Sequence, residues 1–185
     1  MPGEEPEPEL AFDGGSPRTR KQILFQLNDR LKMEPGVKYT RFDPSRITPD
    51  TVVASISPTE FLGEAYPAPV VTLEVWWSPR AVGKDHFTIQ WYEEPDTEAA
   101  IGATNVNDPT LPEEYTLSCG WHQDDHFNEL GEAHFQEEYP DGSTERYGVT
   151  FGDATPRWIL SECLRNLPNR LTVFRDSLDA SPQSD

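Results

Sequence analysis

The chain has 185 residues, which suits one folded domain, and no apolar stretch approaches the roughly 18 residues of a membrane-spanning helix. Its 33 acidic and 15 basic side chains give a formal net charge of −18, a balance typical of proteins that work in molar salt, where ions screen the repulsion between carboxylates. We therefore expect a cytoplasmic protein of a halophilic archaeon, with an acidic mesophilic protein as the alternative. The negative charge does not exclude an RNA partner, because high salt weakens electrostatic attraction to nucleic acids in any case.

The two ends of the chain are predicted to be disordered. Residues 1–16 are dominated by Pro, Glu and Gly, and residues 179–185 are small and polar. Neither stretch offers enough apolar surface to offset the entropy that is lost on ordering. We therefore expect a single α+β domain between residues 17 and 178.

The first predicted element is an amphipathic helix from Pro17 to Met33. It ends at the helix-breaking sequence 34–36, and its apolar residues recur at helical spacing: Ile23, Leu24, Leu27 and Leu31. From there to Pro69, prolines punctuate the chain. We interpret this stretch as loop, apart from one short apolar run at residues 51–56.

The middle of the chain alternates apolar and polar residues in the manner of β-strands. The alternating segments are residues 69–77, 86–92, 114–121 and 132–139, and a return strand at 143–150 follows the turn sequence Pro140-Asp141-Gly142. A loop with little order is expected at residues 94–112. These segments predict an antiparallel sheet of about five strands.

The chain ends in a predicted helix. Thr155 suits the N-cap and Pro156 the first helical position, and the buried stripe consists of Ile159, Leu160, Cys163, Leu164 and Leu167. Pro168 is expected to break this helix before a shorter helical stretch that reaches Leu178. The element order predicts an antiparallel sheet with both terminal helices on one face.

Two other features narrow the functional classes. Cys119 and Cys163 stand in apolar contexts without metal-ligand spacing, so both are predicted to be buried, reduced thiols. Nothing resembles a phosphate loop, a dinucleotide-binding fingerprint, a nucleophile elbow or a recognition helix. A dinucleotide cofactor and a membrane partner are therefore not expected.

Polar residues capable of metal binding concentrate between Trp121 and Gln136. This segment holds His122, Asp124, Asp125, His126 and His134. Imidazoles among carboxylates suit a divalent transition metal and equally suit acid–base chemistry near neutral pH. On a strand, His134 would lie on the face opposite the core, and a loop carrying His126 would fold back over it. Solvent-exposed or structural histidines are the simpler alternative.

Two further residue types could take part in binding. Arg146, on the return strand, could stabilise a phosphate, although a surface ion pair would also account for it. Trp76 and Trp77 are consecutive, so one should face the core and the other the opposite surface. An exposed Trp76, with Tyr92 and Tyr115, could stack on nucleobases or contact a protein; packing under a helix is the alternative.

The histidine-rich segment, the strand after it and the closing helix resemble TumE-like toxins of toxin–antitoxin operons. The matching pieces are residues 121–126, residues 133–136 and the helix from Thr155, within about the last 70–80 residues. Gln136 stands where a second histidine would be expected, and the N-terminal helix and long middle loop have no obvious counterpart. The resemblance implies action on RNA or on translation.

The sequence thus leads to three functional hypotheses. The first is a toxin-like, RNA-acting protein whose catalytic residues are His122, Asp124, His126 and His134, with Asp125 as an alternative to Asp124. The second is a non-enzymatic binding module with a cognate protein partner. The third is a small-ligand or metal-binding protein. Whether the chain is an enzyme, and which metal it would bind, stay open at this point.

Overall fold

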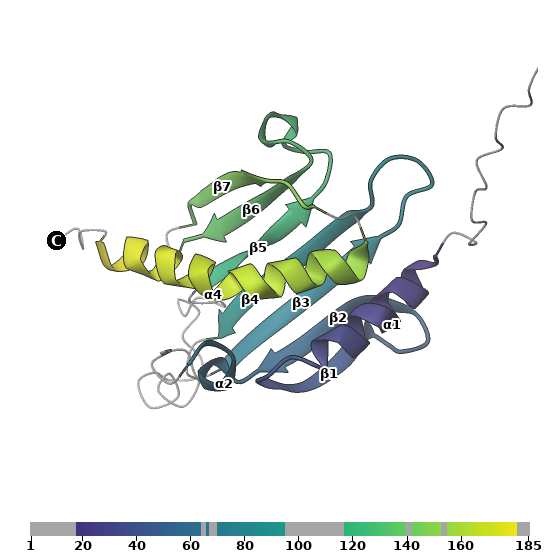
Figure 1. Ribbon diagram of the computed structural model, residues 1–185, viewed down its shortest axis with the longest axis horizontal. Helices are drawn as coiled ribbons and strands as arrows, with labels where there is room; N and C mark the ends of the chain where they lie inside the picture. The colour runs from purple at the N-terminus through teal and green to yellow at the C-terminus, as the bar shows by residue number, and fades with distance from the viewer. Residues whose placement is uncertain are drawn as a thin grey trace, which may run out of the picture.

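In the part of the chain that the structure describes, seven strands follow one another and pair in that same order, each antiparallel to the next (Figure 1). They are β1 (Val37–Pro44), β2 (Pro49–Ile56), β3 (Val70–Ser78), β4 (His86–Glu94), β5 (Leu117–Gln123), β6 (Ala133–Glu138) and β7 (Thr144–Val149). The helices are α1 (Arg20–Leu31), α2 (Pro58–Leu62) and α4 (Pro156–Ala180), with a 3-10 turn, η1, at Asn128–Leu130.

The computed structural model describes residues 18–63, 66, 70–94, 117–139, 142–152 and 155–180. The predicted N-terminal tail, most of the predicted loop at 94–112, Tyr115 and two residues of the predicted turn lie outside these ranges. Gly142 of that turn has a φ of +82°, and its N–H donates to the Tyr139 carbonyl over 2.9 Å. The α+β class and the antiparallel sheet that the sequence predicts are present.

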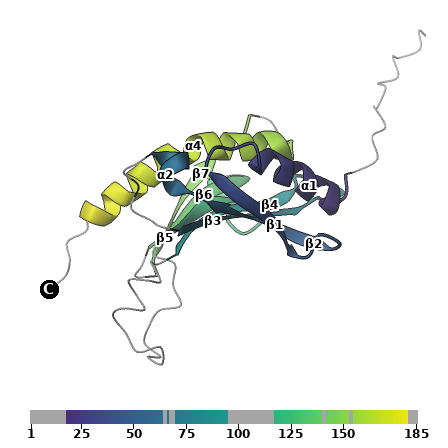
Figure 2. The same ribbon diagram turned by 90° about the horizontal axis from the view of Figure 1, so that it is seen from below.

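One face of the sheet is covered by helices, as predicted (Figure 2). Alternate residues of β2 to β6 point to this face and form the core with the apolar stripes of α1 and α4. The strand residues in it are Val52, Ala54, Ile56, Val71, Leu73, Val75, Trp77, Phe87, Ile89, Trp91, Leu117, Cys119, Trp121 and Phe135. Both cysteines are buried and unpaired. The core thus accounts for the period of two in the strand sequences.

The sheet is wider than predicted, because the stretch interpreted as loop contains two strands. Residues 51–56 belong to β2, and β1 pairs with it along the edge of the sheet. The sequence of β1, VKYTRFDP, leaves none of its side chains fully buried, so it lacks the apolar alternation that identifies a strand. An edge strand with little burial cannot be recognised from hydrophobic pattern.

Helix α1 begins at the capping box formed by Thr19 and Gln22. The last helix differs from expectation, since α4 continues through Pro168 to Ala180. Its buried stripe continues past the proline with Leu171 and Phe174, so packing on both sides outweighs the lost backbone hydrogen bond. A bend along α4 is visible in Figure 2.

The opposite face of the sheet carries polar side chains. Gln90, His122, His134 and Arg146 belong to it, because they alternate with core residues or pair across strands with residues that do. Trp77 is buried in the core while Trp76 is half-buried on this second face, as their adjacency predicts. None of the described helices is both long and apolar enough to cross a membrane.

Candidate functional site

Two histidines lie side by side on the face of the sheet away from the helices. His122 of β5 pairs directly with His134 of β6, so both side chains project from the same side of the sheet. Their rings stack with centroids 5.3 Å apart and planes 16° apart. The register of two antiparallel strands therefore brings together imidazoles that are separated by twelve positions in the sequence.

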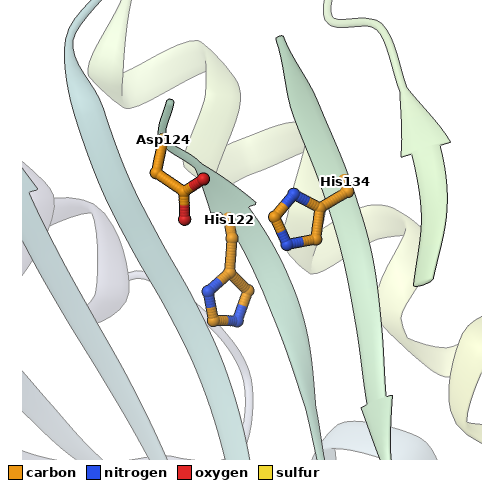
Figure 3. Close-up of side chains that lie close together, drawn as sticks. All are labelled: His122, Asp124 and His134. Atoms are coloured by element: carbon orange, nitrogen blue, oxygen red, sulfur yellow. The ribbon is translucent and has the colours of Figure 1, made fainter. Parts of the chain in front are cut away.

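Asp124 completes a group of three with these histidines (Figure 3). It follows His122 by two positions, and side chains two apart on an extended chain project from the same face. One ligand atom from each of the three residues lies within 4.8 Å of those of the other two. The neighbouring Asp125 turns away, and its carboxylate bonds to Arg80 at 2.9 Å. The structure thus distinguishes the two aspartates.

His126 stands outside this group. Its side chain is 81% exposed, and its ring Nδ1 lies 3.3 Å from the Asp124 carboxylate. Its backbone N–H donates to the same carboxylate over 2.9 Å. The chain after β5 does fold back over His134, as expected, but it places the ring of Phe127 there instead of His126. Of the four sequence-predicted site residues, the structure brings together His122, Asp124 and His134.

Gln90, which no pattern in the sequence indicated, orients His122. Its side-chain nitrogen donates to the Ser118 hydroxyl over 2.6 Å, and its Oε1 lies 2.9 Å from His122 Nε2. In this arrangement Nε2 of His122 donates and Nδ1 keeps its lone pair. The Gln90 side chain can extend over the neighbouring strand β5 because Gly120 has no side chain. A Cβ at Gly120 would stand 2.3 Å from Gln90 Oε1. A metal-binding histidine is commonly held by such a hydrogen bond.

The loop from Asp124 to Glu132 covers His134. Phe127 packs edge-on against the His134 ring, with centroids 5.2 Å apart, and the Arg146 guanidinium lies 4.3 Å above Phe127. Leu130 packs so closely on Gly148, the cross-strand partner of His134, that a Cβ there would stand 2.5 Å from the Leu130 carbonyl. Arg146 also donates to Gln136 over 2.9 Å. Arg146 therefore contacts this loop as well as β6.

Under this cover, His134 has an unsatisfied nitrogen. The residue is 3% exposed, and its Nε2 is buried without a hydrogen-bond partner among the described residues. An unpaired polar atom in a buried position costs about 1–3 kcal/mol. Such an atom is rare in folded proteins, and binding of an ion or a water molecule is one common explanation.

Burial keeps both imidazoles neutral. It lowers the pKa of His122 to about 4, and the neighbouring His134 adds to the effect. Burial also lowers the pKa of His134, against the opposing influence of Asp124. For Asp124 burial raises the pKa, but hydrogen bonds from His126 outweigh it, so that the carboxyl pKa lies below its usual value. At neutral pH the site thus offers two lone-pair nitrogens and one carboxylate.

A donor set of two imidazoles and one carboxylate is a recognised metal-binding combination. Neutral imidazole nitrogens suit Zn²⁺, Fe²⁺, Co²⁺ and Ni²⁺, and a carboxylate contributes the charge. Three protein ligands leave further coordination positions for water or another molecule. General acid catalysis is less well served, because lowered pKa values leave neither histidine as an imidazolium near neutral pH.

The sequence indicated one feature of this site. The spacing His122-x-Asp124 places both on one face of a strand, which favours Asp124 over Asp125. No local pattern pointed to Gln90, Phe127 or Gly148, because their contacts depend on cross-strand register and on the path of a loop. Comparison with protein-family models, with curated proteins and with solved structures found no match for this chain.

Proposed function

We propose that this protein binds a divalent transition-metal ion through His122, Asp124 and His134. The observation that carries the proposal is the convergence of the three ligand groups within 4.8 Å, beneath a loop that buries His134. The unpartnered nitrogen of His134 and the hydrogen bond that orients His122 support it. The proposal is the metal-binding hypothesis of the sequence, narrowed to one carboxylate and two of the histidines.

Closing around an ion requires a small movement. Metal–ligand bonds of about 2.0–2.2 Å place neighbouring ligand atoms roughly 3–3.5 Å apart. The farthest pair in the site must therefore approach by roughly 1 Å or more. We expect Asp124 to make most of this movement, because it lies just beyond the end of β5, whereas both histidines are held within strands.

The direct test is metal content and affinity. The full chain purified without chelator is examined by elemental analysis, and the metal-free protein is titrated with Zn²⁺ and Co²⁺. We expect one ion per chain, with a Co²⁺ visible spectrum typical of mixed nitrogen and oxygen ligands. His134→Ala removes a ligand and should weaken binding at least about 100-fold, more than loss of a supporting hydrogen bond would.

His126→Ala is the matched control. It removes the same side chain from a position four residues after His122, but one that is exposed and outside the trio. We expect its affinity for Zn²⁺ to fall far less than that of the His134→Ala protein, because residue 126 supplies no ligand and its backbone N–H still donates to the Asp124 carboxylate. Thermal unfolding of each variant verifies that it is folded. Equal affinities of the His134→Ala and His126→Ala proteins would contradict the proposal.

Action on RNA, which the TumE-like resemblance implies, is the second candidate function. It is compatible with the same site, because a bound divalent ion can activate water and stabilise a phosphodiester undergoing hydrolysis. The test is incubation of the Zn²⁺- or Mn²⁺-loaded protein with RNA, with His134→Ala as control. Unchanged RNA would remove this candidate and leave metal binding untouched. The cognate protein partner stays a prediction of the sequence, to be tested by affinity capture at molar salt.

A further inference from the structure

A recess of about 310 Å³ opens beside the candidate metal site. It lies between the β3–β4 loop, which contributes Arg80 and Lys84, and the β5–β6 loop, which contributes Asp125 and Glu132. Asp124 lines the same recess, so one of the three proposed metal ligands forms part of its wall. A molecule in this recess would therefore lie next to the bound ion.

Arg80 is held in place at the edge of this recess. Asp85 fixes the loop that carries it, since its carboxylate accepts from the Arg80 backbone N–H over 3.0 Å and from the Trp77 indole over 2.8 Å. Gln123 of β5 donates to the Asp85 carbonyl over 2.5 Å and so ties this loop to the strand that bears His122. The position of Arg80 relative to the metal site is thereby defined by hydrogen bonds.

The guanidinium of Arg80 uses one of its nitrogens, Nη1, in contacts with described residues. Its Nη1 lies 2.9 Å from the Asp125 carboxylate and 2.8 Å from His86 Nε2. Within the described ranges, no partner is found for its Nε or Nη2, and the side chain is 41% exposed. A guanidinium with two free N–H groups in a fork can bind a carboxylate or phosphate through two parallel hydrogen bonds.

The charge of the recess depends on the metal. Two cationic side chains, Arg80 and Lys84, face three carboxylates, those of Asp124, Asp125 and Glu132, which leaves one net negative charge. A divalent ion on Asp124 changes this to one net positive charge. Without the ion an anion would be repelled from the recess, whereas with the ion it would be attracted.

We propose that this recess binds an oxyanion, a carboxylate or a phosphate group, between the metal ion and the guanidinium of Arg80. The inference rests on the proposed function, since the ion supplies the second contact and the change of charge. The remainder of the bound molecule would lie along the recess, between Lys84 and Gly131. Arg80 is then the residue that binds the anionic group of the ligand.

The test uses the full chain loaded with Co²⁺, after metal binding has been measured separately. Inorganic phosphate and acetate are each added at constant ionic strength, and binding is followed by the Co²⁺ visible spectrum and by calorimetry. We expect phosphate or acetate to change the Co²⁺ bands and to bind at least tenfold more weakly to metal-free protein. The relative affinities of phosphate and acetate show which anionic group the recess prefers.

Three variants test the role of Arg80. Arg80→Gln should weaken anion binding at least tenfold with unchanged Co²⁺ affinity. Arg41→Gln is the matched control, because Arg41 also forms an exposed ion pair, with Asp43, but on the edge strand β1. Asp125→Asn removes the carboxylate that competes for Arg80, so it should strengthen anion binding, a gain that misfolding cannot produce.

Different results contradict the oxyanion proposal and the metal-binding proposal. A protein that binds no Co²⁺ contradicts both. A protein that binds Co²⁺ but neither anion overturns only the oxyanion proposal. Equal anion affinity in the Arg80→Gln and Arg41→Gln proteins, or equal affinity with and without the metal, also overturns it.

Discussion

Burial weakens the binding of a proton by His122. In the unfolded chain its imidazole titrates near the ordinary pKa of about 6.5, whereas burial lowers the pKa in the folded protein to about 4. Between these values the unfolded chain takes up a proton that the folded protein does not. The contribution of His122 to the free energy of unfolding is therefore fully present above pH 6.5, and it is lost as the pH falls towards 4.

This linkage predicts a measurable pH dependence. In metal-free protein with chelator present, we expect His122 to contribute a loss of roughly 1–3 kcal/mol between pH 7 and pH 4, allowing for its partial exposure. The measurement is the urea midpoint as a function of pH. His122→Gln should reduce the loss, because it removes the imidazole whose pKa burial lowers. An identical pH profile for the His122→Gln protein would contradict the assigned cause.

At the scale of secondary structure, the β5–β6 loop and the glycines beneath it shape the site. Gly120 lets Gln90 reach His122, and Gly148 lets the η1 turn lie directly on β7. Neither contact involves a left-handed backbone at these two glycines; each depends on the missing Cβ. The cover over His134 is thus built from the close approach of η1 to β7, with the ring of Phe127 packed against the histidine.

Gly148→Ala is predicted to displace the loop. A Cβ 2.5 Å from the Leu130 carbonyl forces the backbone of the turn to move, and overpacking of this kind costs about 1–3 kcal/mol. We expect faster amide hydrogen exchange at residues 127–131 and weaker binding of Zn²⁺. Gly152→Ala is the control, since a Cβ there meets nothing within 4 Å. Unchanged exchange in the Gly148→Ala protein would show that the turn does not depend on this contact.

At the scale of the whole molecule, the net negative charge affects stability more than the surface ion pairs do. Among the described residues, five ion pairs of Lys or Arg lie on the surface: Arg20–Asp50, Lys38–Glu60, Arg41–Asp43, Arg80–Asp125 and Lys84–Glu132. Exposed pairs contribute little, about 0–1 kcal/mol each. The net charge of −18 therefore acts mainly as self-repulsion, which dissolved salt screens.

The expected consequence is stabilisation by salt. We predict that the thermal midpoint rises by several degrees between 0.1 and 2 M KCl. Glu129→Gln and Asp176→Asn remove exposed charges for which the described residues provide no ion pair. These substitutions should raise the midpoint at 0.1 M KCl and have less effect at 2 M. A midpoint that falls with salt would contradict adaptation to high salt.

Local pattern in the sequence determined much of the framework. Helical spacing identified α1 and most of α4, alternation identified β3 to β6, and the turn sequence 140–142 identified β7. The same period of two placed His134 away from the core. These predictions succeed because side-chain burial follows backbone periodicity within one element. The same reasoning failed for β1, which buries too little to show alternation, and for Pro168, where packing of α4 outweighs a local helix-breaking preference.

Only the tertiary structure decided the site. The pairing of His122 with His134 is a matter of strand register, the support from Gln90 comes from a third strand, and Arg80 reaches the recess from a loop more than forty residues away from Asp125. Such contacts depend on how segments distant in the chain pack together. Composition and spacing indicated which residue types gather between Trp121 and Gln136. The fold brings together His122, Asp124 and His134 from this segment, because these three share one face and one end of the sheet.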